Sequence, residues 1–142
     1  MYKNRFLKVV DYCEDNNMKV IFYDGDGDAC YPATGLICIN RSQSWKKRLF
    51  ALLHEVGHIQ IYRNKENWEK DFSVYACSNI DGRIQRSKKF QVSLIAEEID
   101  AWRIGRQIAK DINVFIDPEE YINMMNRCVF TYIQSAPNKI NS

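Results

Sequence analysis

Residues 45–62 carry the segment Trp-Lys-Lys-Arg-Leu-Phe-Ala-Leu-Leu-His-Glu-Val-Gly-His-Ile-Gln-Ile-Tyr, on which the predicted architecture depends. The segment predicts a helix from about Ser44 to Tyr62, with Ser42 or Ser44 as its N-cap. Apolar residues line both sides of this helix, so we expect other elements to cover both sides and the helix to lie centrally in the domain. One apolar stripe consists of Trp45, Leu49, Leu52, Val56 and Ile59.

The segments before this helix predict another helix and a small sheet. Residues 3–14 place apolar side chains at helical spacing. Residues 19–23 and 35–40 are rich in β-branched and aromatic side chains, and a Gly-rich turn at 24–28 follows the first of these strands. The two strands would form a hairpin or lie beside each other. The turn alternates aspartate and glycine as calcium loops do, but an EF-hand requires glutamate at loop position twelve, where this chain has Gly35.

The segments after the central helix predict two further long helices and a variable connection. Helical periodicity returns from about Gln91 to Ile112, and Asp117-Pro118 begins a last helix, with aspartate as the cap and proline at the first helical position. Residues 63–90 show no sustained period, and we expect a short helix near 68–75 and a turn at 79–82. The expected fold class is α+β, with four to five helices packed on a sheet of two to three strands.

The composition indicates one globular domain spanning residues 1–142. Apolar residues make up 46% of the chain and charged residues 27%, which is typical of soluble domains. Basic and acidic residues are interspersed and give a net charge of +2, so we expect no direct binding to nucleic acid. No apolar run reaches the roughly 18 to 20 residues of a membrane span, and the five cysteines form no CxxC pair. We therefore expect a cytoplasmic protein with reduced thiols and no membrane association.

The central helix contains His54-Glu55-Val-Gly-His58, which is the HExxH pattern. Side chains four residues apart lie on one face of a helix, so both imidazoles could bind one ion. Zn²⁺ suits this arrangement because it accepts imidazole nitrogen and keeps an open position in catalytic sites. Glu55 is then expected to be the catalytic base, not a ligand. The chain has no other histidine, and chance would produce this pattern in roughly one sequence per thousand.

The third ligand must be a carboxylate or a cysteine, because no histidine remains. The pattern HExxHxxGxxH fails, since Ile61 and Asn64 occupy the positions of its glycine and last histidine. In the next long helix, Glu98 falls at the centre of the apolar arc, whereas Glu97 and Asp100 fall on the polar side. A lone carboxylate in an apolar stripe is unfavourable unless it is paired or coordinated, so Glu98 is the expected third metal ligand.

Alternatives stay open for these acidic residues. Glu98 could instead pair with Arg103 or Arg106 at the rim of the core, and Glu97 or Asp100 could replace it as the ligand. Asp100 could also orient a ligand histidine by a hydrogen bond from outside the ligand set.

The chain resembles the small ImmA/IrrE-like metallopeptidases of bacteria, phages and mobile elements. The resemblance covers most of the chain from residue 20 onward and rests on two segments, Arg48–His58 and Glu98-Ile-Asp-Ala101-Trp102, the second being similar to the E-x-x-A signature of that family. It implies a small zincin-like domain of the gluzincin type, with the same three zinc ligands and the same base. The chain departs from the family pattern after Ala101, where Trp102 and Ile104-Gly105 stand in place of the usual residues.

These observations predict a zinc metalloendopeptidase that cleaves a specific protein or peptide, and the resemblance implies a repressor-type transcription regulator as substrate. We expect the strand at 35–40 and the 63–90 connection to place an extended substrate by β-addition. The alternative function is a non-catalytic inhibitor or adaptor whose metal only holds two helices together, although such a site has no need of Glu55 and would usually be closed by four ligands. A helical domain without metal is the remaining interpretation.

Overall fold

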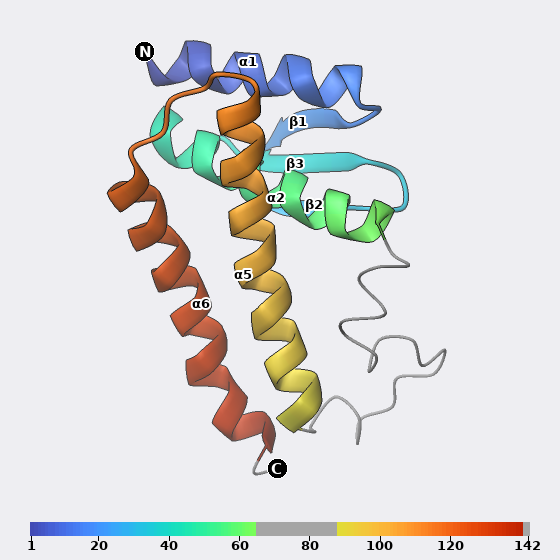
Figure 1. Ribbon diagram of the computed structural model, residues 1–142, viewed down its shortest axis with the longest axis vertical. Helices are drawn as coiled ribbons and strands as arrows, with labels where there is room; N and C mark the ends of the chain where they lie inside the picture. The colour runs from blue at the N-terminus through green and yellow to red at the C-terminus, as the bar shows by residue number, and fades with distance from the viewer. Residues whose placement is uncertain (65–87, 141–142) are drawn as a thin grey trace.

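The computed structural model describes residues 1–64 and 88–140 of the chain, and these form an α+β domain (Figure 1). The described residues contain four helices packed with a three-stranded mixed sheet, which confirms the predicted fold class. The short helix expected near 68–75 and the turn expected at 79–82 lie outside the described residues. In chain order the elements are α1 (Tyr2–Asp15), β1 (Lys19–Tyr23), β2 (Ala29–Tyr31), β3 (Leu36–Asn40), α2 (Trp45–Arg63), α5 (Lys88–Asp111) and α6 (Pro118–Ile140).

The helix ends follow the signals in the sequence. Ser44 caps α2, since its hydroxyl accepts a hydrogen bond from the Lys47 backbone N–H. Asp117 caps α6 in the same way by accepting from the Glu120 backbone N–H, and Pro118 takes the first helical position. The helices α2 and α6 therefore begin where their caps predict.

The sheet has the order β1-β3-β2, so β3 is the middle strand. β1 pairs with β3 in parallel, from Lys19 opposite Leu36 to Tyr23 opposite Asn40, and β2 pairs with β3 antiparallel. The adjacency expected for the first and last strands is confirmed, but the hairpin alternative is wrong. The short strand β2, which the sequence analysis missed, intervenes in the chain and forms the hairpin with β3 itself, because antiparallel strands can be joined by a tight turn.

One face of the sheet packs against α1 and α2. Phe22 of β1 stacks on Phe6 of α1 at 5.5 Å between ring centroids, and Trp45 of α2 meets both rings edge-on. Phe22 pairs with Ile39 across the sheet, and paired residues share a face, so Ile39 points the same way and is fully buried. The stripe predicted for α2 is buried here, with Leu49, Leu52, Val56 and Ile59 all fully enclosed.

The helix α5 crosses α2, and α6 lies beside α5 (Figure 1). The crossing is close because each helix presents a glycine to the other. A Cβ at Gly57 of α2 would overlap the backbone carbonyl of Ala101, and a Cβ at Gly105 of α5 would overlap that of Leu53. The two backbones are therefore in direct contact, which fixes the depth at which α5 side chains reach α2.

No helix in the described ranges is both long enough and apolar enough to pass through a lipid bilayer.

Candidate metal centre

The two histidines of α2 lie side by side on the helix face that meets α5. Their ring centroids are 4.6 Å apart, and the Nε2 atoms of His54 and His58 approach to 3.0 Å. Trp102 of α5 stacks on the His54 ring at 4.4 Å and 11° between planes. Because the two histidines are four residues apart on the helix, one nitrogen of each ring points to the same place, as the motif predicts.

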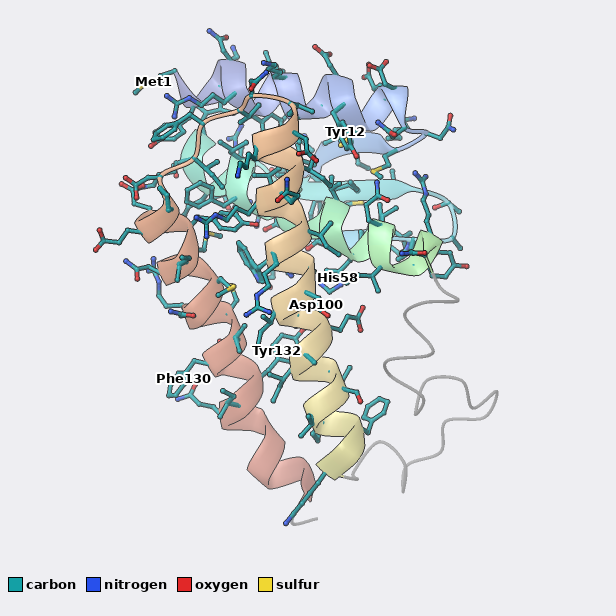
Figure 2. The ribbon with its side chains drawn as sticks, in the orientation of Figure 1. Met1, Tyr12, His58, Asp100, Phe130 and Tyr132 are labelled. Atoms are coloured by element: carbon teal, nitrogen blue, oxygen red, sulfur yellow. The ribbon has the colours of Figure 1, made fainter. Side chains whose placement is uncertain are left out.

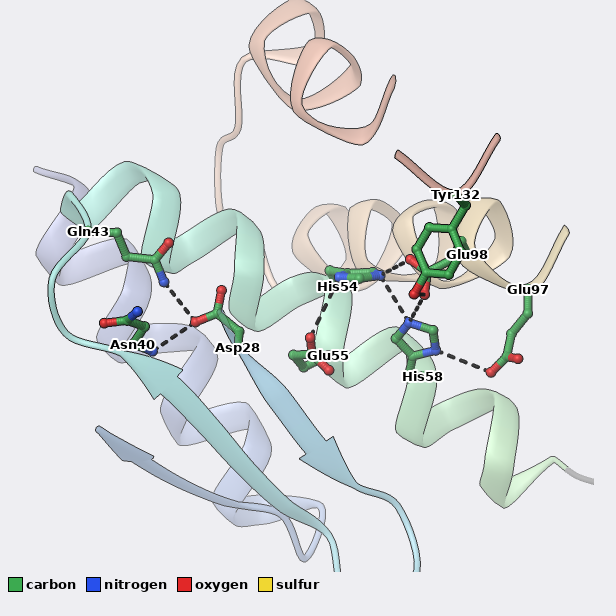
Figure 3. Close-up of polar contacts among 9 residues, drawn as sticks. All are labelled: Asp28, Asn40, Gln43, His54, Glu55, His58, Glu97, Glu98 and Tyr132. Atoms are coloured by element: carbon green, nitrogen blue, oxygen red, sulfur yellow. Dashed lines mark hydrogen bonds and ion pairs between the residues drawn. The ribbon is translucent and has the colours of Figure 1, made fainter. Parts of the chain in front are cut away.

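Glu98 of α5 joins this pair. Its Oε2 lies 2.8 Å from His54 Nε2, and its Oε1 lies 3.0 Å from His58 Nε2 (Figure 3). The residue is 6% exposed, so the carboxylate is taken out of water and aimed at the rings. The alternative pairing of Glu98 with Arg103 or Arg106 is not what the structure shows. The position of Glu98 at the centre of the apolar arc of its helix is the sequence feature that predicted its place beside the histidines.

The three side chains form a group that could hold a metal ion. One ligand atom from each of His54, His58 and Glu98 lies within 4.8 Å of the other two. Ligands of a tetrahedral zinc ion, at roughly 2.0 to 2.2 Å from the metal, lie roughly 3.3 to 3.6 Å from one another. Outward shifts of a few tenths of an ångström in these side chains would accommodate the ion, so the donor set fits zinc in both chemistry and spacing.

The charges in the group shift its pKa values strongly. Burial acts to lower the pKa of His58, but hydrogen bonds to Glu97 and Glu98 outweigh burial and raise it to about 10. Burial acts to raise the pKa of Glu98, but the hydrogen bonds from His54 and His58 hold it well below its usual range. The ionised Glu98 therefore favours a positive charge next to it, whether a proton on His58 or a bound metal cation.

Glu55, the expected base, lies beside the His54 ring on the side of Nδ1. It is 7% exposed, and its Oε1 is 3.7 Å from His54 Nδ1. Cys30 of β2 lies near this carboxylate, and burial followed by the charge of Glu55 raises the pKa of the Cys30 thiol. The thiol is not part of the three-residue group.

Glu97 takes part in the site in a way that the sequence analysis did not predict. Its Oε1 accepts a hydrogen bond from His58 Nδ1 at 3.2 Å, on the side of the ring away from the other histidine. The helical wheel placed Glu97 on the polar side of α5, but its side chain is long enough to reach the ring from the edge. Asp100 lies half-buried on the same helix, and its orienting role stays a prediction.

Tyr132 of α6 is another site residue that the sequence analysis missed. Its hydroxyl donates a hydrogen bond to Glu98 Oε1 at 3.1 Å. The side chain points from α6 toward α5, whereas Phe130 projects away from the domain (Figure 2). The sequence predicted the helix itself, but not which of its faces meets the histidines, and so gave no reason to select this tyrosine.

A cavity of about 670 Å³ opens beside the group. Asp28, Glu55, Glu97 and Glu98 line it, and no lysine or arginine of the described residues does so. Asp28 is itself held in place, since its Oδ1 accepts hydrogen bonds at 2.8 Å from the Asn40 backbone and from the Gln43 side chain (Figure 3). The remaining lining residues include Ala29, Cys30, Pro32, Ile61, Tyr62, Cys128, Thr131 and Tyr132.

Comparison with descriptions of protein families, with curated proteins and with solved structures gave no match to this chain.

Proposed function

We propose that the protein is a zinc-dependent metallopeptidase that hydrolyses peptide bonds at this centre. The observation that carries the proposal is the convergence of His54, His58 and Glu98 beside a buried glutamate, Glu55, in a cavity large enough for a peptide side chain. Two histidines and one carboxylate are a ligand set of catalytic zinc sites, which keep a position open for water or substrate.

The metal ligands and Glu55 have different roles in the proposed reaction. A zinc ion held by the three ligands would polarise the carbonyl of the substrate and increase the acidity of water beside it. Glu55 accepts a proton from a water molecule as the water oxygen forms its bond to the carbonyl carbon. Glu55 then returns this proton to the amide nitrogen as the C–N bond breaks, so that the carboxylate is regenerated.

The sheet offers a place for an extended substrate, although at a different strand from the one expected. β3 is paired on both sides, by β1 and by β2, so its backbone is not available for β-addition. β2 is an edge strand, and its residues Ala29 and Cys30 line the cavity. A peptide paired with the outer edge of β2 would pass beside Glu55. The resemblance to the ImmA/IrrE-like metallopeptidases supports a repressor-type regulator as the proposed substrate, and a bacterial, phage or mobile-element context.

The proposal is tested by metal content and hydrolysis in a set of variants. We expect the wild-type protein to bind one zinc ion and to cleave members of a peptide mixture detected by mass spectrometry. Glu55→Gln keeps the ligands and removes the base, so zinc binding should persist while hydrolysis falls by about 10²- to 10⁴-fold. His54→Ala should lose both.

The control substitution is Glu14→Gln on the exposed surface of α1, which should alter neither property. Zinc binding without hydrolysis in the wild-type protein would instead favour the non-catalytic inhibitor or adaptor, in which the ion only joins α2 to α5. A protein that binds no zinc would contradict both functions.

A further inference from the structure

Apart from its two histidines, the cavity has no cationic side chain among the described residues that could stabilise negative charge on a substrate. Four carboxylates line it, and neither lysine nor arginine does so among the residues that the structure describes. Addition of water to an amide carbonyl places charge on the carbonyl oxygen, and enzymes stabilise that charge with hydrogen-bond donors already in position. With zinc bound, both histidines are occupied by the ion, so a side-chain donor for the carbonyl oxygen has to be a neutral group.

The described side chains of the cavity offer three hydroxyl groups, on Tyr62, Thr131 and Tyr132. Only the Tyr132 hydroxyl is hydrogen-bonded to a residue of the candidate ligand set, namely Glu98, at 3.1 Å. It therefore lies within one hydrogen bond of the group that would hold the ion. Tyr62, near the end of α2, and Tyr132 are exposed to similar extents, at 44% and 38%, so the hydrogen bond to Glu98 is what distinguishes Tyr132.

We propose that Tyr132 is a catalytic residue whose hydroxyl donates a hydrogen bond to the carbonyl oxygen of the substrate as this oxygen gains negative charge. The inference rests on the proposed peptidase function and adds a residue to it. Glu98 Oε1, which now accepts from Tyr132, is also the oxygen 3.0 Å from His58 Nε2. In this role the tyrosine hydroxyl exchanges its hydrogen bond to Glu98 for one to the substrate oxygen, while Glu98 stays with the ion. The hydroxyl keeps its proton throughout and only changes its acceptor.

The placement of the base agrees with this role. In the close-up, Glu55 and Tyr132 lie on opposite sides of the His54 ring, Glu55 toward the strands and Tyr132 toward α5 (Figure 3). Attack on a carbonyl needs the base next to the incoming water and a donor next to the carbonyl oxygen. A substrate in the cavity that both residues line meets both requirements.

A different role would give Tyr132 the same contact. The hydroxyl could merely position Glu98 as a metal ligand, which would make it a positioning residue. Loss of such a partner typically lowers metal affinity by about 10- to 100-fold, and an excess of metal then restores activity. Loss of an oxyanion donor typically lowers kcat by about 10²- to 10³-fold while metal affinity is unchanged.

The experiment compares Tyr132→Phe with Tyr12→Phe in the full chain. The control tyrosine lies on α1, away from the cavity, where its hydroxyl accepts a hydrogen bond at 3.3 Å from Gln60. Three quantities are measured: zinc affinity by competition with a chelating dye, kcat and KM at saturating zinc, and the affinity of a phosphonate peptide whose charged oxygens imitate the transition state.

We expect Tyr132→Phe to bind zinc as the wild type does, to lose about 10²- to 10³-fold in kcat with little change in KM, and to lose phosphonate affinity by a comparable factor. Tyr12→Phe should match the wild type in all three measurements. Unchanged kcat and phosphonate affinity in Tyr132→Phe would overturn the inference, as would a loss that excess zinc restores. A wild-type protein that cleaves nothing would instead contradict the proposed function, and phosphonate binding would still report on Tyr132.

Discussion

At the scale of single residues, each imidazole of the centre is held by contacts from α5. His54 has Trp102 stacked on its ring and Glu98 at Nε2, while His58 has Glu98 at Nε2 and Glu97 at Nδ1. A carboxylate at the far nitrogen of a ligand histidine fixes its tautomer and increases its basicity. Glu97 is placed to do this for His58.

Glu97→Gln should therefore weaken zinc binding by about 10- to 100-fold, because an amide neither carries the charge nor accepts as strongly from His58 Nδ1. Zinc affinity measured by chelator competition checks this. Asp100→Asn on the same helix is the matched control and tests the role expected for Asp100. Equal losses in both variants would assign the orienting role to both acids, and a loss in Asp100→Asn alone would reverse our assignment to Glu97.

The residues of the site differed in how far the sequence could predict them. His54, Glu55 and His58 were predictable because their relation is local, one turn of a single helix. Glu98 was predictable because a charged group at the centre of an apolar stripe needs a partner. Glu97 and Tyr132 were not, since their roles depend on how far a side chain bends and on how two helices are rotated relative to each other, which periodicity does not specify.

At the scale of elements, the contact between α2 and α5 sets the geometry of the centre. Gly57 and Gly105 each face a backbone carbonyl of the other helix, so the helices cannot approach further or tolerate a side chain between them. Glu98 lies one turn of α5 from the Ala101 carbonyl that meets Gly57, and His58 follows Gly57 directly in α2. The glycine contact and the ligand group therefore share the same few turns of helix.

Gly57→Ala should destabilise the protein by about 1 to 3 kcal/mol through overpacking and should also weaken zinc binding, because α5 has to move away from α2. In a helix without such a contact, the same substitution stabilises the protein by about 0.5 to 1 kcal/mol. A loss of stability in Gly57→Ala would therefore indicate the close contact with Ala101. Urea denaturation and zinc titration measure the two effects.

Gly35→Ala is the control for general destabilisation. Gly35 has φ 75°, and a Cβ there would meet the Asn17 carbonyl at 2.6 Å and the Arg63 side chain at 3.2 Å, at the end of α2 and more than one turn beyond His58. This variant should lose about 1 to 2 kcal/mol of stability and keep its zinc affinity. A Gly57→Ala protein as stable as the wild type would refute the close contact.

The helices and strands with a clear sequence pattern were predicted, and the short strand β2, which has a weak one, was not. Helices α1, α2, α5 and α6 and strands β1 and β3 follow from periodicity, caps and β-branched residues. β2 spans three residues, Ala29–Tyr31, which is too short for alternation to show, and its pairing with β3 depends on a turn of the chain closing at Gly35. Because β2 lies between β1 and β3 in the chain and reverses its direction, β3 runs parallel to β1. This parallel pairing could not be predicted without β2.

At the scale of the whole molecule, the ion and the fold should stabilise each other, because the ligands come from two helices separated by the 64–87 segment of the chain. The raised pKa of His58 has a definite consequence for stability in the metal-free protein. Its contribution is complete below the ordinary pKa of about 6.5 and is lost as the pH rises through about 10. Zinc binds neutral imidazole, so its affinity increases over the same range.

The thermal midpoint should therefore rise on zinc addition, and by more at higher pH. Zinc at 100 times its Kd contributes about 2.7 kcal/mol, which corresponds to a Tm increase of roughly 5 to 10 °C in a domain of this size. Calorimetry with zinc and with a chelator, between about pH 6.5 and pH 9, measures this difference. The Tm of His54→Ala should not change when zinc is added. If the Tm difference between the zinc and chelator samples became smaller with rising pH, this would contradict the positive charge assigned to His58 in the metal-free protein.

The crossing of α2 and α5 also affects how the protein tolerates change. Because main chain meets main chain at Gly57 and Gly105, the separation of the two ligand helices is independent of the size of the side chains around them. We therefore expect substitutions of leucines and valines elsewhere in the core to lower the stability of the protein while the span between the imidazoles and Glu98 is preserved. The arrangement of these three side chains would then tolerate changes in the rest of the core.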